Sequence, residues 1–201
     1  MTIKRRDLVK GSLAGLGLAS MSACRFSLTQ TKSEDGSGLL PDYDYVLTAE
    51  PAPLEIVPGT QSPALGFNGE FPAPVIRANQ GVPIRILFKN KLRQATTIHW
   101  HGIRIDIKMD GVPFLSQDPV QPGESFLYEF TCPDAGTFWY HPHMHSVEQL
   151  GKGLVGALIV EERVTQPFDD EVIVGLKDWR LDKQGDFLPL LDPASFFDKK
   201  F

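Results

Sequence analysis

The sequence has no concentration of positive charge and no long hydrophobic run. Its 20 Lys and Arg residues are outnumbered by 25 Asp and Glu residues, so the 201-residue chain carries a net charge of −5. A nucleic-acid partner requires basic side chains gathered in a patch or stripe, and we therefore expect none. The apolar stretch at residues 13–21 is shorter than the roughly 20 residues that a membrane-spanning helix needs.

Cysteine is scarce as well, because the chain contains only Cys24 and Cys132. The residues before Cys24, Met-Ser-Ala, resemble a lipoprotein cleavage box, in which the cysteine carries a lipid. A lipid anchor at Cys24 is one alternative, and a mature chain without that anchor is the other. In both cases we expect Cys132 to be a free, buried thiol and not half of a disulfide.

The first 24 residues have the features of an export signal. Arg5 and Arg6 precede the short apolar stretch, and small residues follow it. The paired arginines resemble a twin-arginine signal, which exports proteins already folded; an ordinary secretory signal is the alternative. We expect residues 1–24 to be a twin-arginine-type export signal and residues 25–42 a flexible linker. The predicted location is the periplasm, with membrane anchoring as a lipoprotein left open.

Helical patterns are missing too, since no amphipathic segment is longer than about three turns. Sixteen prolines and 18 glycines instead separate short apolar runs, which is typical of an all-β domain. Ile84, Ile86 and Phe88 alternate with Arg85 and Lys89, as in a half-buried strand, and every second residue over 126–130 is aromatic in the same way. Residues 154–160 are continuously apolar, as in a strand buried on both faces. These patterns predict a β-sandwich.

Histidine occurs at two places and nowhere else. The five histidines are His99 and His101 in one stretch, and His141, His143 and His145 in another. On a β-strand residues i and i+2 face the same side, roughly 6.6 Å apart. Each H-x-H pair can therefore point two imidazoles one way, and two such strands side by side bring four together. Imidazoles without a carboxylate pattern favour copper or zinc over magnesium or calcium. The spacing alone leaves open whether one ion or several are bound.

Three segments carry a resemblance to the multicopper oxidases, the laccase-like family: TTIHWHGIRIDIKMDGVP, QDPVQPGESFLYEF and GTFWYHPHMHSVEQLGKGLVGALIVEE. Together they resemble the first cupredoxin domain of that family over residues 43–165, with both H-x-H motifs in the family's order. The resemblance implies a cupredoxin-like Greek-key β-sandwich. It also implies an oxidoreductase that takes single electrons from a reducing substrate and reduces O₂ to water.

The resemblance further implies the role of each histidine in a trinuclear copper cluster. His99 would bind the type 2 copper. His101 and His141 would bind one ion of the type 3 pair, and His143 the other. His145 has no fixed counterpart, and a surface position is expected for it.

Other residues near the histidines are expected to have structural roles. Trp100 and Trp139 are expected to pack behind the ligands, and residues 110–111 to form a turn. Glu148 is expected to face solvent, although its place in the sequence also suits a carboxylate that supports the ligands.

The sequence departs from the family in what it does not contain. No further histidine follows His145, so the family's H-x-x-H-x-H and H-C-H motifs are missing, and Cys132 has no nearby histidine with which to form a blue-copper site. We therefore expect the cluster to be completed by missing domains or a partner chain, and the 201 residues alone to be inactive. Residues 166–201 are expected to be a linker and the incomplete start of a second cupredoxin domain, with a strand at 171–181.

Two other functions remain open at this point. One is a stand-alone periplasmic cupredoxin that binds copper for resistance or delivery. The other is a relative of the oxidases that binds no metal, against which the four retained histidines argue. Phenols, Cu(I) and Mn(II) are equally compatible as substrates of the complete enzyme.

Overall fold

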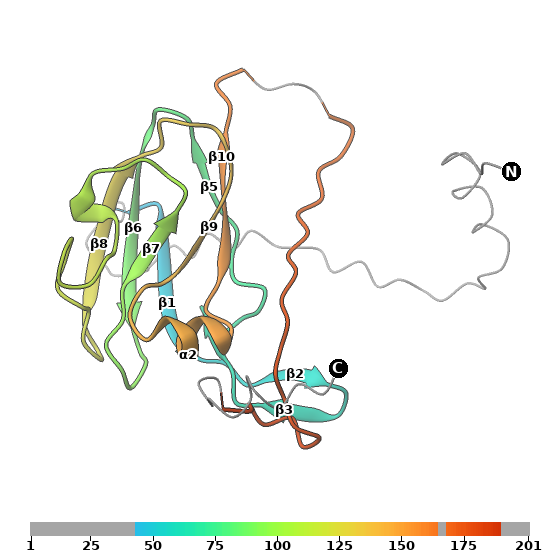
Figure 1. Ribbon diagram of the computed structural model, residues 1–201. Coiled ribbons are helices and arrows are strands. Elements are labelled where there is room, and N and C mark those ends of the chain that lie inside the picture. The colour runs from blue at the N-terminus through green and yellow to red at the C-terminus, as the bar shows by residue number, and fades with distance from the viewer. Residues whose placement is uncertain (1–42, 165–167, 190–201) are drawn as a thin grey trace, which may run out of the picture. The chain divides into compact units, whose positions relative to one another are not determined.

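The structure, a computed structural model, describes residues 43–164 and 168–189. Two four-stranded sheets pack face to face, and a small hairpin and one short helix complete the fold (Figure 1). The strands are β1 (Tyr45–Pro51), β2 (Leu54–Val57), β3 (Thr60–Ser62), β4 (Leu65–Phe67), β5 (Ile76–Asn79), β6 (Pro83–Asn90), β7 (Ile98–His101), β8 (Ser125–Thr131), β9 (Gly136–Pro142) and β10 (Gly156–Glu161). The helices are the 3₁₀ turn η1 (Ile107–Met109) and α2 (Ser146–Gly151).

The strand order confirms the predicted all-β, cupredoxin-like Greek-key β-sandwich. One sheet has the order β4-β1-β6-β8 and the other β5-β10-β9-β7, while β2 and β3 form the separate hairpin. Pairs β1–β6 and β5–β10 are parallel, and the other pairs are antiparallel. Successive strands cross between the sheets, so β7 and β9 are neighbours although β8 lies in the opposite sheet.

The alternating patterns form the core as expected. In β6 the residues Ile84, Ile86 and Phe88 are buried, and the intervening residues are partly exposed. Strand β8 pairs with β6 and buries Tyr128 and Phe130. The apolar run at the end of the domain forms β10, where residues 158–160 are buried on both faces of the strand. Burial of apolar area is the main force that holds two such sheets together.

Aromatic packing is concentrated beneath β7. Trp100 is fully buried, and its ring centroid lies 5.2 Å from that of Tyr128, 5.0 Å from that of Phe130 and 5.8 Å from that of Tyr140. Contacts of this kind add about 0.5–1.5 kcal/mol per pair beyond area burial. They hold β7 firmly on the sandwich at the point where it carries His99 and His101.

The remaining structural predictions concern Cys132, a membrane-spanning helix and the N-terminal segments. Cys132 is a free thiol and fully buried, as predicted. Within residues 43–164 and 168–189, no helix has the length and apolar character needed to cross a bilayer. The predicted export signal, the linker at 25–42 and the anchor at Cys24 lie outside the described residues.

The segment 168–189 contains no strand or helix of its own and is drawn mostly as an extended trace (Figure 1). Arg77 forms ion pairs with Glu161 of β10 and with Glu171 of this segment. The predicted strand at 171–181 is not observed as such, because within the described residues the segment forms only an isolated bridge between Leu181 and Phe187. An extended chain becomes a strand only when a neighbour satisfies its backbone groups.

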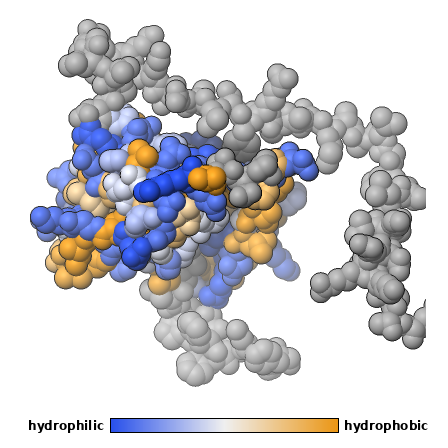
Figure 2. All heavy atoms as spheres, turned by 90° about the horizontal axis from the view of Figure 1, so that it is seen from above, coloured by the Kyte–Doolittle hydropathy of each residue, from blue (hydrophilic) through white to orange (hydrophobic). Residues whose placement is uncertain are grey.

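The same segment leaves apolar side chains in solvent. Val172, Val174 and Leu176 are all strongly exposed. Figure 2 shows one face of the molecule, on which hydrophobic residues form separate patches among hydrophilic ones. The segment is nevertheless attached at its far end, where the Trp179 ring packs edge-on against Phe71 at 5.1 Å and lies 5.8 Å from Phe187.

Candidate metal centre

Strands β7 and β9 place His99, His101 and His141 on one face of the second sheet, and His143 follows directly after β9. The two strands pair antiparallel, with His99 directly opposite His141 and Trp100 opposite Tyr140. Because side chains alternate along a strand, the histidines face outward while Trp100 and Tyr140 enter the core. Pro142 is accommodated because it is the last residue of β9.

The four predicted ligand side chains converge. The His99 ring centroid lies 5.4 Å from each of the rings of His101, His141 and His143. One nitrogen from each of His99, His101 and His141 lies within 4.8 Å of the others. His143 is exposed and lies in the bend between β9 and α2, beyond the last paired residue of β9. That these four bind copper stays a prediction.

The separation of two nitrogens fits a shared ion. Nδ1 of His101 and Nε2 of His141 are 3.2 Å apart. Imidazole nitrogens bind ions such as zinc at about 2.0–2.1 Å, so two ligands on one ion are separated by about this distance when they subtend an angle of roughly 100°. The donor set therefore fits a borderline metal such as copper or zinc.

His141 is prepared for metal binding by its surroundings. Its side chain is 8% exposed, and burial is the main reason why its pKa is lowered to about 4. The neighbouring imidazoles lower this pKa further, whereas the carbonyl of Pro142 opposes them by accepting a hydrogen bond from Nδ1 at 2.9 Å. Because a carbonyl can only accept, Nδ1 carries the proton, and the lone pair of Nε2 faces Nδ1 of His101. At neutral pH this ring needs to lose no proton to bind a metal.

Asp110 orients His99, a contact that sequence analysis missed. Nδ1 of His99 donates to the backbone carbonyl of Asp110 at 2.8 Å, and the Asp110 carboxylate lies 3.4 Å from the same nitrogen. This bond leaves Nε2 of His99 for a metal and fixes the plane of the ring. The sequence predicted only a turn at 110–111, and the Asp-Gly pair was the one signal available.

Gly111 allows this loop to lie against β7. It has a φ of +75°, and a Cβ atom on it would lie 1.8 Å from the carbonyl oxygen of Ile98. No other amino acid fits this position without moving the loop. Asp106 also stabilises the loop, because its side chain accepts a hydrogen bond from the backbone of Lys108 in η1.

Trp139 packs directly on the ligand rings. It lies opposite His101 on the paired strand, and its ring stacks on His101 at 4.5 Å and on His141 at 4.2 Å, with interplanar angles of 27° and 26°. Trp100 instead lies in the core on the other side of the sheet. The expectation that both tryptophans pack behind the ligands therefore holds for Trp100. Trp139 instead lies on the same face as the histidines, where its indole restricts the tilt of two imidazoles.

His145 and Glu148 have other surroundings. His145 is exposed, as expected, and occupies the N-cap position of α2 with a left-handed φ of 49° and no capping hydrogen bond from its side chain. Glu148 is partly buried, and its carboxylate accepts from Lys152 at 2.7 Å and from Gln94 at 3.1 Å. These contacts lower the pKa of Glu148 and engage both of its carboxylate oxygens.

A Greek-key β-sandwich that presents three imidazoles from two adjoining strands, and a fourth from the bend that follows, is a cupredoxin-like domain with a candidate metal centre. A multicopper oxidase family model matches residues 48–165. The chain therefore belongs to the multicopper oxidase family. The metal of this family is copper, and its members are oxidoreductases.

Relatives and solved structures agree with this assignment. Copper resistance protein A of Escherichia coli is 35% identical over 208 residues, covering 96% of this chain and 34% of the relative. A multi-copper oxidase from Pseudomonas thermotolerans is 53% identical with a TM-score of 0.73, covering 75% of this chain and 37% of that one. A multi-copper oxidase from Pseudomonas parafulva is 50% identical with a TM-score of 0.72, covering 76% and 38%. The chain thus spans about a third of the length of these proteins.

Proposed function

We propose that this chain is the copper-binding N-terminal part of a laccase-like multicopper oxidase. The observation that carries the proposal is the convergence of two H-x-H motifs on β7 and β9, with two nitrogens 3.2 Å apart. His99 would bind a type 2 copper, His101 and His141 one type 3 copper, and His143 the other. These four would be half of the histidines of a trinuclear cluster.

The complete cluster would accept single electrons that originate from a reducing substrate and pass them to O₂, forming water. The chain's own residues would hold and orient imidazoles. Asp110 keeps the Nδ1 proton on His99, and the Pro142 carbonyl keeps the Nδ1 proton on His141, so that Nε2 of each ring is available. Trp139 limits the rotation of His101 and His141. Missing domains or a partner chain would provide the other histidines.

A blue-copper site is not expected within these 201 residues. That site needs a cysteine thiolate with two histidines, and the single described cysteine, Cys132, is buried with a pKa raised to about 11 by that burial. We therefore propose that the 201-residue chain alone neither oxidises phenols with O₂ nor shows the intense colour of a copper–thiolate bond. Strong visible absorption on addition of Cu(II) would contradict this.

A second candidate function is a periplasmic cupredoxin that binds copper for resistance or delivery. The relative from Escherichia coli is named a copper resistance protein, which favours a role in copper handling. The two candidate functions differ in whether O₂ is consumed. A delivery protein binds Cu(II) and transfers it to a chelator or acceptor, whereas an oxidase consumes O₂ once the missing histidines are present.

We propose export to the periplasm by the twin-arginine route, with Arg5 and Arg6 as the signal and Cys24 as a candidate lipid anchor. Replacing Arg5 and Arg6 with Lys should leave the protein in the cytoplasm, as measured by cell fractionation. Unchanged export would indicate the ordinary secretory route. Mass spectrometry of the mature N-terminus would separately reveal whether Cys24 is acylated.

The central experiment is a titration of the 201-residue chain with Cu(II), followed by electron paramagnetic resonance and calorimetry. Binding with the spectrum of ordinary, non-blue copper is expected. His99→Ala and His143→Ala should weaken it more than His145→Ala, which serves as the matched control because His145 lies outside the converging rings. If His145→Ala were the most damaging change, the proposed ligand set would be wrong and a site built on residues 141–145 would replace it.

A further inference from the structure

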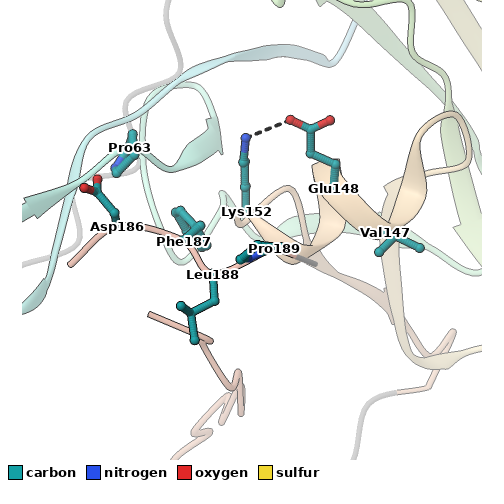
Figure 3. Close-up of a pocket in the computed structure, with 8 residues that line it drawn as sticks. All are labelled: Pro63, Val147, Glu148, Lys152, Asp186, Phe187, Leu188 and Pro189. Carbon is teal, nitrogen blue, oxygen red and sulfur yellow. Dashed lines mark hydrogen bonds and ion pairs between the residues drawn. The ribbon is translucent and has the colours of Figure 1, made fainter. Parts of the chain in front are cut away.

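Helix α2 is attached to the sandwich in an unusual way. It has six residues, and the only buried one is a polar residue, Gln149, which is fully inaccessible to solvent. Helices of this size are unstable by themselves and are normally held by an apolar face. The outward side of α2 carries the ion pair between Glu148 and Lys152, next to an open depression of about 420 Å³ (Figure 3). A partly exposed pair of this kind contributes little to stability.

The buried amide of Gln149 joins α2 to the chain that enters β7. Its Oε1 accepts a hydrogen bond from the Thr96 hydroxyl at 2.7 Å. Its Nε2 donates to the Ala95 carbonyl at 3.2 Å and to Oε1 of Gln94 at 3.4 Å. Thr96 is itself fixed by two backbone hydrogen bonds to Val120, at 2.9 and 3.1 Å. The amide thus connects the segment after the second histidine motif with the segment before the first.

This connection matters most for His143. The ladder between β7 and β9 aligns His99 with His141 and ends at Ile98 opposite Pro142. His143 is the next residue, so no ladder hydrogen bond places it, and it lies in the bend that leads into α2. Its position relative to His99 therefore depends on where α2 is held.

We propose that Gln149 is a positioning residue for the metal centre, which acts by holding α2 on residues 94–96 and thereby keeps the His143 ring beside His99. The copper part of this inference rests on the proposed function, but the placement of the ring does not. Replacing a residue that does not bind the metal but positions a ligand typically lowers metal affinity by about 10–100-fold.

The test compares Gln149→Met with variants of its partner in the 201-residue chain. Gln149→Met keeps the length of the side chain and removes the amide. We expect it to lower Cu(II) affinity by at least tenfold. Thr96→Val should act in the same direction, whereas Thr96→Ser should retain near-normal affinity because it keeps the hydroxyl. Thr97→Val is the matched control, since Thr97 is equally buried and its hydroxyl has no hydrogen-bond partner among the described residues.

A double variant separates positioning of His143 from general damage. If Gln149 acts through His143, then Gln149→Met should cause no further loss of affinity in a His143→Ala background. An equal loss in both backgrounds, or no loss in either, would overturn the inference. Circular dichroism of each variant checks that the sandwich has formed.

A measurement without metal keeps the inference independent of copper binding. The rings of His99 and His143 lie 5.4 Å apart between centroids, close enough for a nuclear Overhauser effect between their protons in a sample without added copper. Gln149→Met should abolish that signal, and Thr97→Val should preserve it. If the wild type bound no Cu(II), the proposed function would fail while this result still decided the role of Gln149. Retention of the signal in Gln149→Met would refute that role.

Discussion

Replacement of Gly111 by Ala tests whether the loop at residues 110–111 must lie against β7 to hold the metal centre in place. Gly111 has a φ of +75°, and an added Cβ would lie 1.8 Å from the carbonyl oxygen of Ile98 and 3.0 Å from the backbone nitrogen of His99. Non-bonded carbon atoms approach other heavy atoms to about 3.5 Å, so the loop would have to move away from β7 by well over ~1 Å. Asp110 would move with it.

Two costs combine in this variant. A left-handed backbone costs an alanine about 1–2 kcal/mol. Displacement of the loop also breaks the 2.8 Å hydrogen bond from His99 to the Asp110 carbonyl. The loss of such a bond costs about 1 kcal/mol, and looser packing between the displaced loop and β7 adds to that figure. We therefore expect Gly111→Ala to lower the free energy of unfolding by about 2–4 kcal/mol.

Gly123 provides the matched control, because its φ is +84° but an added Cβ would meet nothing within 4 Å. Gly123→Ala should cost only the backbone strain of about 1–2 kcal/mol. Urea unfolding of both metal-free variants measures the difference, and Cu(II) titration should show weaker binding for Gly111→Ala alone. Equal destabilisation of the two variants would refute the argument that this loop presses on β7.

Three further predictions concern single side chains. Burial lowers the pKa of His141 from 6.5 to about 4, so the unfolded chain takes up a proton at a higher pH than the folded, metal-free chain. The free energy of unfolding of the metal-free chain should therefore fall by up to about 3 kcal/mol as the pH decreases from 6.5 to about 4, and level off below that. Urea titrations at several pH values should show this pH dependence, and His141→Gln should remove it. Cys132 is fully buried with a pKa raised to about 11, so a thiol reagent should react with it only in denaturant, and fast labelling of the native chain would contradict its position. Trp139→Leu should weaken Cu(II) binding in a titration more than Trp139→Phe, which keeps a stacking ring; equal effects would show that stacking does not matter.

Periodic patterns explain how much of the fold was predictable. The alternation in β6 and the apolar run in β10 follow from the two-residue repeat of a strand, and this repeat is visible in the sequence. The same repeat puts His99 and His101 on one face of β7, whereas His143 lies past the end of β9 in the bend before α2. The spacing of the histidines thus indicated the four candidate ligands, and the resemblance to the multicopper oxidases indicated that the two pairs would meet.

Contacts between loops were not predictable in this way. The hydrogen bond from His99 to Asp110 spans 11 residues, and the hydrogen bond between Thr96 and Gln149 spans 53. Neither has a repeat or a characteristic spacing, because both depend on how loops pass over the ends of the sheet. The prediction of a strand at 171–181 was wrong for a related reason, because strand propensity alone does not make a strand without a partner.

The path of the chain explains why the site requires the whole sandwich. Between β7 and β9 the chain crosses to the opposite sheet, where β8 pairs with β6, and only then returns to place β9 beside β7. A simple hairpin would join the two histidine pairs locally, whereas this route makes their alignment depend on packing between the sheets. Trp100, with Tyr128 from β8 and Tyr140 from β9 against its ring, lies at the centre of that packing. The geometry of His99 and His141 is therefore a property of the folded core, and a core substitution should disturb the metal centre even though it touches no imidazole.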